Sequence, residues 1–595
     1  MNILHLAKGP AIPARRAEPG VGFLCYSWDS LRACEAAGLP ARPWEDDFPV
    51  ADAPAISAEA VSLAGAWYRD GGRDFTLFSG VSLGAAHEWL VWNLSIQPLA
   101  KLLTALDAAV VREGAKTLRC ETSLPADWRA AIESFARARG LAFESVAHPG
   151  AGREIYSWQA PPPRLSAGKI LAGRLLDAAS RLRGGAGKPR ALVSWYPSLD
   201  GLLDRDDAPF DWTLADFPTK KRIGAALRRG WRLQAGPWSA PSWDRAGREA
   251  LAQVQADWRR LRDDAAYAAA LSFRGTPLLP ALRPALDELF TSRLEPLAWA
   301  ARETARLLRE EPPAVVLLPY DTPPYQRVLA GLARAAGVPT ALLIHGLPFD
   351  VNYPFADRQC DELLVWGPEQ RREYAAARPP RASRAVGNPG FDRHAGTARP
   401  AGGPIRRVLV LPRAKWADIL VGSSNFEPER YAIGVAAALK AAGFADVVFR
   451  PHPAESPDYY REILGDSARV ETAGSFGDAV AGADLVIGTY STTLLEVMLR
   501  GKPLLCVNFT KGLDFAPPFD GRWGVDVLRS PAELEARLKR LTAEPAREAG
   551  ILTAPYPKIL AAYCGPSDGR AADRVLDALA DLARRGRPAP EKTPA

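Results

Sequence analysis

The stretch from residue 314 to residue 346 constrains the fold more than any other part of the chain. It reads "AVVLLPYD", an apolar run, then "TPPYQRVLAGLARAAG", a segment with helix-starting prolines and a closing glycine, then a second apolar run, "VPTALLIHG". Two buried strands joined by one helix pair in parallel, because a crossover is needed to return the chain alongside the first strand. The chain is therefore predicted to belong to the α/β class.

The same alternation recurs on both sides of this unit. Residues 1 to 160 alternate short apolar runs with helix-like segments such as "SIQPLAKLLTALDAAVVREGA", and the pattern resumes at "RALVSWYPS". A further doubly wound unit opens at "RRVLVLPRAKW" and continues through "ADVVFRPHP", "ADLVIGTYS" and "KPLLCVNF". We predict two Rossmann-like doubly wound domains that face a cleft, and an additional N-terminal α/β domain.

Stretches rich in proline and glycine mark the predicted domain boundaries. "APPPR" at 160–164 forbids a regular element, and "GTARPAGGP" at 396–404 is typical of an interdomain linker. In chain order we predict an N-terminal α/β domain of unknown role (1–163), a basic linker helix (164–190), an acceptor-side Rossmann-like domain (191–400), a nucleotide-binding Rossmann-like domain (401–545), C-terminal helices (546–586) and a disordered tail (587–595).

Composition narrows the class of protein but names no activity. The net charge is +7, with 47% hydrophobic and 24% charged residues, and no segment matches a nucleic-acid module, so we expect no nucleic-acid partner. The six cysteines are scattered without a CxxC pair, which predicts reduced thiols and neither disulfides nor zinc. We expect no signal peptide, because the apolar stretch at the N-terminus is too short for one, and we find no run of about 18 apolar residues. We expect a cytoplasmic protein, at most peripheral to the inner membrane.

Two basic segments are the candidates for that peripheral contact. Residues 164–190 hold seven basic residues and one acidic residue, and apolar residues recur there at helical spacing: Leu171, Leu175, Ala179 and Leu182. Such a helix either lies on anionic lipid or packs on its neighbour with a solvated basic face. The cluster at 219–232, "TKKRIGAALRRGWR", has the same two interpretations or meets an anionic acceptor.

Polar residues directly after the apolar runs are the candidate site residues, since ligands bind at the carboxyl ends of the strands in doubly wound sheets. In the first Rossmann-like domain these are Asp321, His345 and Asp350. In the second they are Arg413, Lys415, Arg450, His452, Thr489, Ser491, Thr492, Thr493 and Glu496.

The motif "RPHP" and the later "GTYSTTLLE" together predict a phosphate site. Pro451 and Pro453 stiffen the turn that carries Arg450 and His452, so both donors are held in place at a low entropic cost. "GTYSTTLLE" places hydroxyls and backbone N–H groups at a helix start, and its Glu496 could accept hydrogen bonds from ribose hydroxyls. Taken singly, the hydroxyls are equally explained as a helix cap, and His452 as a turn residue bonded to the backbone.

"RPHP" and "ADLVIGTYSTTLLEVMLRGKPLL", together with "IHG", "VWG" and "VGNPGFD", resemble motifs of the cytoplasmic GT-B glycosyltransferases that build bacterial surface polysaccharides. The most similar members are capsule-type Kdo transferases and bacterial sialyl- and polysialyltransferases, which use CMP-activated acidic sugars. The resemblance spans residues 310–585. It implies a GT-B fold, and it implies phosphate-binding roles for Arg450, His452, Pro453, Ser491 and Thr492.

For glycosyl transfer we expect Asp321 to act as the catalytic carboxylate, with His345 as the second candidate. Asp321 has an alternative role as the cap of the helix that begins at Thr322 or Pro323. No DxD pattern follows a strand, so we expect no catalytic metal and no cofactor besides the nucleotide-sugar donor. Departure of the nucleotide would be assisted by Arg450, His452 and the N-terminus of the helix that follows "GTYS", and by Arg413 or Lys415.

The leading hypothesis is transfer of an acidic sugar such as Kdo or sialic acid from CMP to a glycan or lipid-linked glycan acceptor. One alternative is polyol-phosphate transfer, because CDP-glycerol glycerophosphotransferases share both motifs, although they usually carry Ser-Ser and an Asp where this chain has Ser491, Thr492 and Glu496. Another is an isomerase of the UDP-GlcNAc 2-epimerase kind, which would need an Asp-Ser-Gly-Gly run in place of Thr489-Tyr490-Ser491. A non-catalytic scaffold of a polysaccharide assembly complex is the last alternative.

Overall fold

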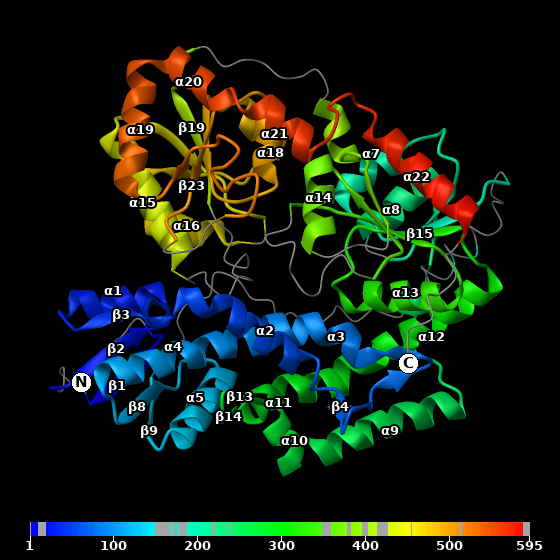
Figure 1. The fold of residues 1–595 in the computed structure, drawn as a ribbon, viewed down its shortest axis with the longest axis horizontal. Coiled ribbons are helices and arrows are strands. Elements are labelled where there is room, and N and C mark those ends of the chain that lie inside the picture. Colours follow the sequence, from blue (N-terminus) through cyan, green and yellow to red (C-terminus); the bar gives the residue numbers. More distant parts are fainter. Residues whose placement is uncertain are drawn as a thin grey trace.

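Three large β-sheets, each made of parallel strands only, organise the chain. The computed structural model describes residues 2–9, 19–148, 187–216, 220–234, 236–239, 241–347, 359–377, 382–394, 403–412, 426–453, 455–510 and 515–586, with Gly168, Leu171, Leu175 and Ala178. Figure 1 shows one sheet in the lower left part of the molecule and the other two side by side above it.

The first sheet has the order β3-β2-β1-β8-β9 and belongs to the N-terminal domain. Its strands are β1 (Ile3–Ala7), β2 (Val21–Cys25), β3 (Ala41–Pro43), β8 (Thr117–Glu121) and β9 (Ala142–Val146). Helices α1 (Trp28–Ala36), α4 (Gln97–Glu113) and α5 (Ala126–Ala138) lie around them, whereas α2 (Ala53–Ala64) and α3 (Leu83–Val91) extend away from the sheet, toward the right in Figure 1. The strand order changes direction between β1 and β8.

The second sheet has the order β12-β11-β10-β15-β16-β17-β18. Its strands are β10 (Arg190–Val193), β11 (Asp211–Leu214), β12 (Arg232–Leu233), β15 (Val315–Leu318), β16 (Thr340–Leu343), β17 (Glu362–Val365) and β18 (Ser383–Ala385). The helices α7 (Asp200–Leu203), α8 (Lys220–Arg229), α13 (Pro324–Ala335) and α14 (Pro368–Ala377) join them. The predicted strand–helix–strand unit at 314–346 is β15, α13 and β16, and its strands pair in parallel as expected.

The third sheet has the order β21-β20-β19-β22-β23-β24. Its strands are β19 (Arg407–Leu411), β20 (Asp446–Phe449), β21 (Arg469–Val470), β22 (Leu485–Gly488), β23 (Leu504–Val507) and β24 (Val527–Leu528). Its helices are α15 (Glu427–Ala441), α16 (Pro457–Leu464), α17 (Phe476–Ala481), α18 (Thr493–Leu499), α19 (Pro531–Ala543), α20 (Pro545–Thr553) and α21 (Tyr556–Tyr563). Two Rossmann-like domains plus an N-terminal α/β domain confirm the predicted fold class.

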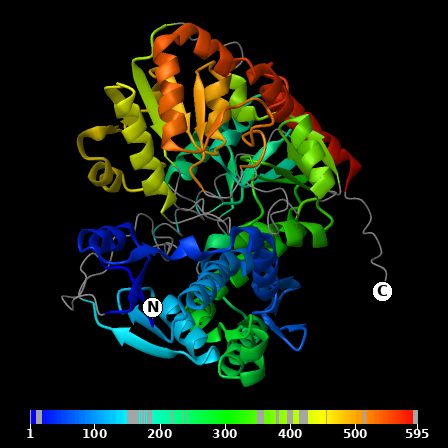
Figure 2. The same ribbon diagram turned by 60° about the vertical axis from the view of Figure 1, so that its left-hand side comes forward.

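The helices between β12 and β15 share a core with the N-terminal domain. They are α9 (Arg245–Leu261), α10 (Ala265–Ala270), α11 (Leu279–Glu288) and α12 (Leu294–Glu310). Phe290 stacks on Trp258 at 4.8 Å and meets the edge of Trp67, an N-terminal residue, at 6.1 Å. Figures 1 and 2 show these helices beside α2 to α5 and below the second sheet. The N-terminal unit is therefore completed by residues from the next domain.

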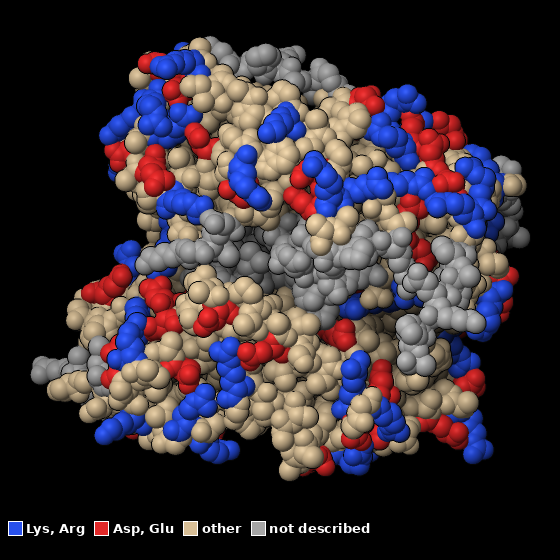
Figure 3. All heavy atoms as spheres, in the orientation of Figure 1, with Lys and Arg blue, Asp and Glu red and all other residues tan. Residues whose placement is uncertain are grey.

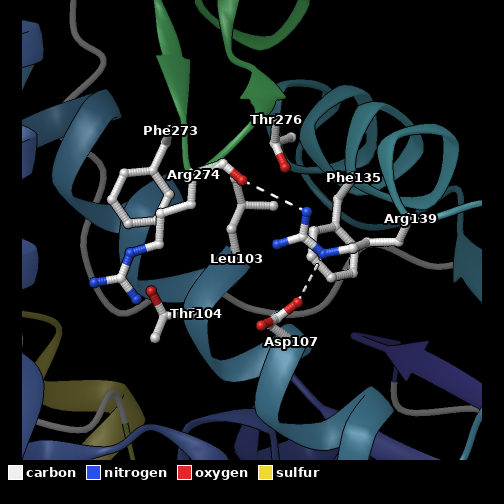
Figure 4. Close-up of a pocket in the computed structure, with 8 residues that line it drawn as sticks. All are labelled: Leu103, Thr104, Asp107, Phe135, Arg139, Phe273, Arg274 and Thr276. Carbon is white, nitrogen blue, oxygen red and sulfur yellow. Dashed lines mark hydrogen bonds and ion pairs between the residues drawn. The ribbon is translucent and has the colours of Figure 1, made fainter.

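A shallow pocket lies on the seam between these two sets of elements (Figure 4). Its walls come from α4, α5 and the hairpin of β13 (Ser272–Phe273) and β14 (Thr276–Pro277). Arg139 donates to Asp107 at 2.9 Å, and Arg274 donates to Glu59 at 2.8 Å. The pocket therefore lies where the N-terminal domain meets the helices of the next domain. Because both arginines are already paired with carboxylates, their charges are offset and do not attract an anion to the pocket.

The C-terminal helix α22 (Ala571–Arg585) returns to the first Rossmann-like domain (Figure 1). The carboxylate of Asp392 accepts the backbone N–H groups of Ala571 and Ala572, at 3.0 and 2.9 Å, and so caps this helix. Further along, Arg384 of β18 pairs with Asp581 at 2.5 Å. The chain therefore crosses twice between the two Rossmann-like domains.

One helix in the described part of the chain, Leu83–Glu113, is long and apolar enough to cross a membrane, but 61% of its most apolar window is buried inside the protein. Such burial is typical of a core helix. On the face drawn in Figure 3, basic and acidic side chains are interspersed. Two arginines of the 219–232 cluster follow this pattern, since Arg229 pairs with Asp204 at 2.6 Å and Arg232 lies 4.0 Å from Glu311.

Candidate functional site

The order of the second sheet changes direction between β10 and β15, which is where ligands bind in doubly wound sheets. The sequence candidates Asp321 and His345 follow β15 and β16. Asp321 is fully buried, and its carboxylate accepts the backbone N–H of Gln359 at 2.8 Å. It does not cap α13, whose N-cap is Pro323 and has no side-chain cap. In this conformation Asp321 holds the backbone at Gln359, just before β17. The catalytic role of Asp321 remains a prediction.

His345 is held as a neutral base. Its side chain is exposed to solvent, while its Nδ1 lies 2.9 Å from the carbonyl oxygen of Pro319. A carbonyl only accepts, so Nδ1 carries the proton and Nε2 has the lone pair. The protein nevertheless shields part of the ring from water, which disfavours the charged imidazole and lowers the pKa of His345 below its usual value. Nε2 has no hydrogen-bond partner among the residues that the structure describes.

Two tyrosines that the sequence did not single out surround His345. Tyr196 follows β10 and Tyr320 follows β15, so they stand on the two sides of the point where the sheet order reverses. Their ring centroids are 5.9 Å apart with the rings at 89°, and the His345 ring lies 5.2 Å from Tyr196 and 5.4 Å from Tyr320. All three side chains are at least partly exposed. The sequence could have pointed to these two tyrosines by their position directly after an apolar run. An aromatic residue in that position is easily taken for a residue of the hydrophobic core.

In the third sheet the order reverses between β19 and β22. Ser491, Thr492 and Thr493 follow β22 there, and all three are partly exposed, whereas Thr489 is only 6% exposed. The hydroxyls of Ser491 and Thr493 lie 2.8 Å apart, and Ser491 also accepts the backbone N–H of Thr493 at 3.3 Å. Because α18 spans only seven residues, the hydroxyls and not a helix dipole are the polar groups offered at this edge.

Arg450 and His452 lie one strand away from that point, after β20. The guanidinium of Arg450 donates to the carbonyls of Ala473 and Gly474, at 2.9 and 2.8 Å, and holds the turn before α17. His452 and Pro453 are exposed, and the backbone N–H of His452 donates to Glu455, a buried carboxylate, at 3.0 Å. Partial burial lowers the pKa of His452. His452 is therefore presented on a rigid turn, and Arg450 is engaged by the protein.

The two Rossmann-like domains meet at the candidate residues. The backbone N–H of Leu347, two residues after His345, donates to the hydroxyl of Thr492 at 2.9 Å. A Cβ atom at Gly346 would lie 3.0 Å from the same hydroxyl, so a larger residue there would push against Thr492. This contact brings the carboxyl ends of β16 and β22 together. His345 and the Ser491–Thr493 hydroxyls therefore lie on the two loops that this hydrogen bond joins.

Glu496 makes a second contact across the junction. Its carboxylate lies 3.1 Å from Nε2 of His394 and 3.4 Å from Arg393, both from the "VGNPGFDRH" segment. Burial acts to raise the pKa of Glu496, but the His394 hydrogen bond and the charges of Arg393 and Arg500 outweigh burial, so its pKa lies below the usual value. Thr492 and Glu496 stand one turn apart, so one helix carries both contacts. The predicted ribose contact of Glu496 would share a carboxylate that is already bonded.

Three sequence candidates, Asp350, Arg413 and Lys415, lie outside the described residues. Most of the predicted linker helix and the predicted boundaries at 160–164 and 396–402 also lie outside them. In the described ranges, no three His, Cys, Asp or Glu side chains gather as metal ligands would. The domain limits predicted there and the roles of these three residues remain predictions.

No family model and no curated protein matches the chain. Solved structures do resemble it. A Listeria monocytogenes protein assigned as a UDP-N-acetylglucosamine 2-epimerase has a TM-score of 0.42 at 12% identity, covering 68% of this chain and 100% of its own. Anabaena HepE, in complex with UDP and glucose, has a TM-score of 0.36 at 12% identity (66% and 100%). The wall teichoic acid polymerase TagF has a TM-score of 0.32 at 13% identity (46% and 73%).

Because all three TM-scores lie below 0.5, the fold assignment rests on the strand orders of the chain's own sheets. Nothing in the comparisons singles out the Kdo or sialyltransferase type, so that resemblance remains a prediction. The architecture itself agrees with a GT-B arrangement, since two Rossmann-like domains meet at the carboxyl ends of their strands.

Proposed function

We propose that the protein is a GT-B glycosyltransferase that uses a nucleotide-sugar donor. The observation that carries this proposal is the hydrogen bond between Leu347 and Thr492, which joins the loop of His345 in one Rossmann-like domain to the loop of the Ser491–Thr493 hydroxyls in the other. Sugar transfer needs a base for the acceptor hydroxyl and donors for the departing phosphate in one place. The two joined loops carry both kinds of group.

In the proposed reaction, Nε2 of His345 takes the proton of an acceptor hydroxyl as its oxygen bonds to the anomeric carbon. The bond from that carbon to the nucleotide phosphate breaks, and the electron pair leaves with the phosphate oxygen. Ser491, Thr493 and His452 would hydrogen-bond this phosphate and stabilise its charge. Arg450 would act by holding the turn at 473–474, as its hydrogen bonds indicate.

We further propose a CMP-linked acidic sugar as donor and a glycan or lipid-linked glycan as acceptor, which rests on the sequence resemblance. The test incubates the full chain with CMP-, CDP- and UDP-linked donors and a lipid-linked acceptor extract, and measures the released nucleotide. Release from a CMP-sugar alone supports the proposal. Release only from CDP-glycerol would favour polyol-phosphate transfer, and conversion of a UDP-sugar without release would favour an epimerase. A chain that turns over none of the donors would have to be a scaffold.

Replacing Ser491 or His452 with alanine is expected to weaken nucleotide binding. A hydrogen bond to a charged phosphate is worth about 1.5–3 kcal/mol, so each variant should lose roughly 10- to 100-fold in affinity by calorimetry. Ser530→Ala is the matched control, because Ser530 caps α19 at the edge strand of the same sheet. Affinity that is unchanged in both variants would remove the phosphate role from these residues.

We also propose that the basic segment 164–190 contacts an anionic lipid surface. Two of its described helical residues, Leu171 and Leu175, are 59% and 62% exposed and one turn apart. Exposed leucines beside many basic residues are typical of interfacial helices. The segment's remaining residues lie mostly outside those that the structure describes.

The double variant Leu171→Asp/Leu175→Asp is expected to lose sedimentation with vesicles of anionic phospholipid, since both apolar contacts and net charge are reduced. Val111→Asp is the control, because Val111 is also a highly exposed apolar residue, 77% exposed, but lies on α4. Wild-type binding to anionic but not to zwitterionic vesicles is the expected pattern. Equal sedimentation of the double variant and the wild type would refute the contact.

A further inference from the structure

We infer that Tyr196, Tyr320 and His345 form a subsite that binds a pyranose ring of the acceptor. This inference rests on the proposed function and adds the residues that would bind a sugar ring of the acceptor. The three rings meet in a corner, with Tyr196 and Tyr320 perpendicular at 5.9 Å and His345 within 5.4 Å of both. The corner occupies the point between β10 and β15 where a ligand of this sheet is expected.

The backbone holds both tyrosines in place. Tyr196 precedes Pro197, which restricts the residue before it to an extended conformation, and its carbonyl accepts the N–H of Leu199 at 2.9 Å. Tyr320 follows Pro319, whose carbonyl is the group bonded to His345. The turn below Tyr196 is fixed by Trp195, whose indole donates to Asp200 at 2.9 Å. A rigid aromatic surface of this kind loses little entropy when a ligand binds.

The chemistry of the corner suits a sugar. A pyranose presents a patch of C–H groups on one face, and the faces of aromatic rings carry the negative end of a quadrupole, so the two surfaces attract. The sugar's hydroxyls need polar partners at the rim of such a surface. Tyr196 supplies a hydroxyl for which the described residues offer no hydrogen-bond partner, and His345 supplies Nε2. Burial raises the pKa of Tyr196, which keeps this hydroxyl a donor.

A polyol phosphate fits the corner less well. An open-chain polyol has no flat C–H face, and the three described side chains that form the corner, two tyrosines and a neutral histidine, include no cation to pair with a phosphate. The hydroxyls at 491–493, in the other domain, are the groups proposed for the phosphate. The subsite therefore favours a glycan acceptor over a glycerol-phosphate chain.

Saturation-transfer NMR on the full chain tests the inference. The tyrosine ring protons are saturated in the presence of methyl β-D-galactopyranoside, N-acetyl-D-glucosamine or sn-glycerol 3-phosphate. We expect saturation of the ring C–H protons of at least one pyranoside and none of glycerol 3-phosphate. Tyr196→Ala and Tyr320→Ala should each weaken pyranoside binding by roughly 10-fold, whereas Tyr196→Phe and Tyr320→Phe, which keep the rings, should retain the saturation signal.

Phe143→Ala is the control for aromatic truncation, because it removes a half-buried ring from β9 of the N-terminal domain. Calorimetry with CMP on each variant checks that the fold and the nucleotide site are intact. Saturation of glycerol 3-phosphate alone, of the CMP base alone, or of pyranosides equally in the alanine variants would each overturn the subsite. None of these results touches the donor-release test, so the subsite can fail while glycosyl transfer stands.

Discussion

His345→Ala is expected to lower the rate of sugar transfer by about 10²- to 10⁴-fold, the usual contribution of a positioned general base. The affinity for nucleotide should change little, because the phosphate is proposed to bind Ser491 and Thr493. Single-turnover measurement of nucleotide release separates the two effects. His148→Ala, which removes a histidine of the N-terminal domain, is the matched control. A variant at position 345 with the wild-type rate would return the base role to Asp321.

The lowered pKa of His345 predicts how the rate of sugar transfer depends on pH. His345 must be neutral to accept a proton, and its pKa lies below the usual 6.5 of a histidine. The rate is therefore expected to rise with pH through that lowered pKa and to be level at and above neutral pH. A rate that rises only above pH 7 would contradict the depressed pKa. Measuring donor affinity at each pH removes any contribution from binding.

Glu121→Ala is expected to destabilise the N-terminal sheet by about 3–5 kcal/mol, because a buried carboxylate with several donors is lost. Glu121 is 1% exposed and accepts the backbone N–H groups of Lys8 and Gly9, at 2.9 and 3.0 Å. It also accepts the hydroxyl of Ser123 at 2.9 Å and lies 3.3 Å from Nε2 of His5. These contacts span β1 and β8, where the order of the first sheet reverses.

The loss of stability is measured by amide hydrogen exchange of β1 and β8 in the full chain at increasing urea concentrations. Glu144→Ala is the control, since Glu144 is half exposed and pairs with Arg119 on the same sheet. Burial acts to raise the pKa of Glu121, but its hydrogen bonds outweigh burial and lower it. The stabilisation is therefore present above the unfolded-state pKa and disappears as the pH falls through the lowered folded-state pKa. If the amides of β1 were equally protected from exchange in the Glu121 and Glu144 variants, Glu121 would not stabilise the first sheet.

The sheets were predictable from the sequence, and the cross-domain contacts were not. Short apolar runs bounded by turn residues, such as 315–318 and 485–488, favour buried strands, so their number and order of appearance predicted the two Rossmann-like domains. The same reasoning placed His345 and Ser491 at strand ends. The bond from Leu347 to Thr492 joins residues 145 positions apart, and no spacing rule predicts such a pair.

Two further features escaped the sequence for physical reasons. Tyr196 and Tyr320 follow apolar runs, and an aromatic residue in that position is more often core than binding surface, so their exposure was not foreseen. The N-terminal domain was predicted to end at residue 163 because of the prolines there, which say nothing about which later segments pack against it. The core made by Trp67 and Phe290 shows that helices after residue 245 complete that unit, because burial depends on packing and not on sequence neighbourhood.

The return of α22 has a mechanical consequence for the two Rossmann-like domains. The chain crosses between them once between His394 and Gly403 and again between Tyr563 and Ala571. Two connections restrict the relative movement of the domains more than a single connection would. The bonds from Thr492 to Leu347 and from Glu496 to His394 lie between these domains, so a movement that separated the domains would have to break both.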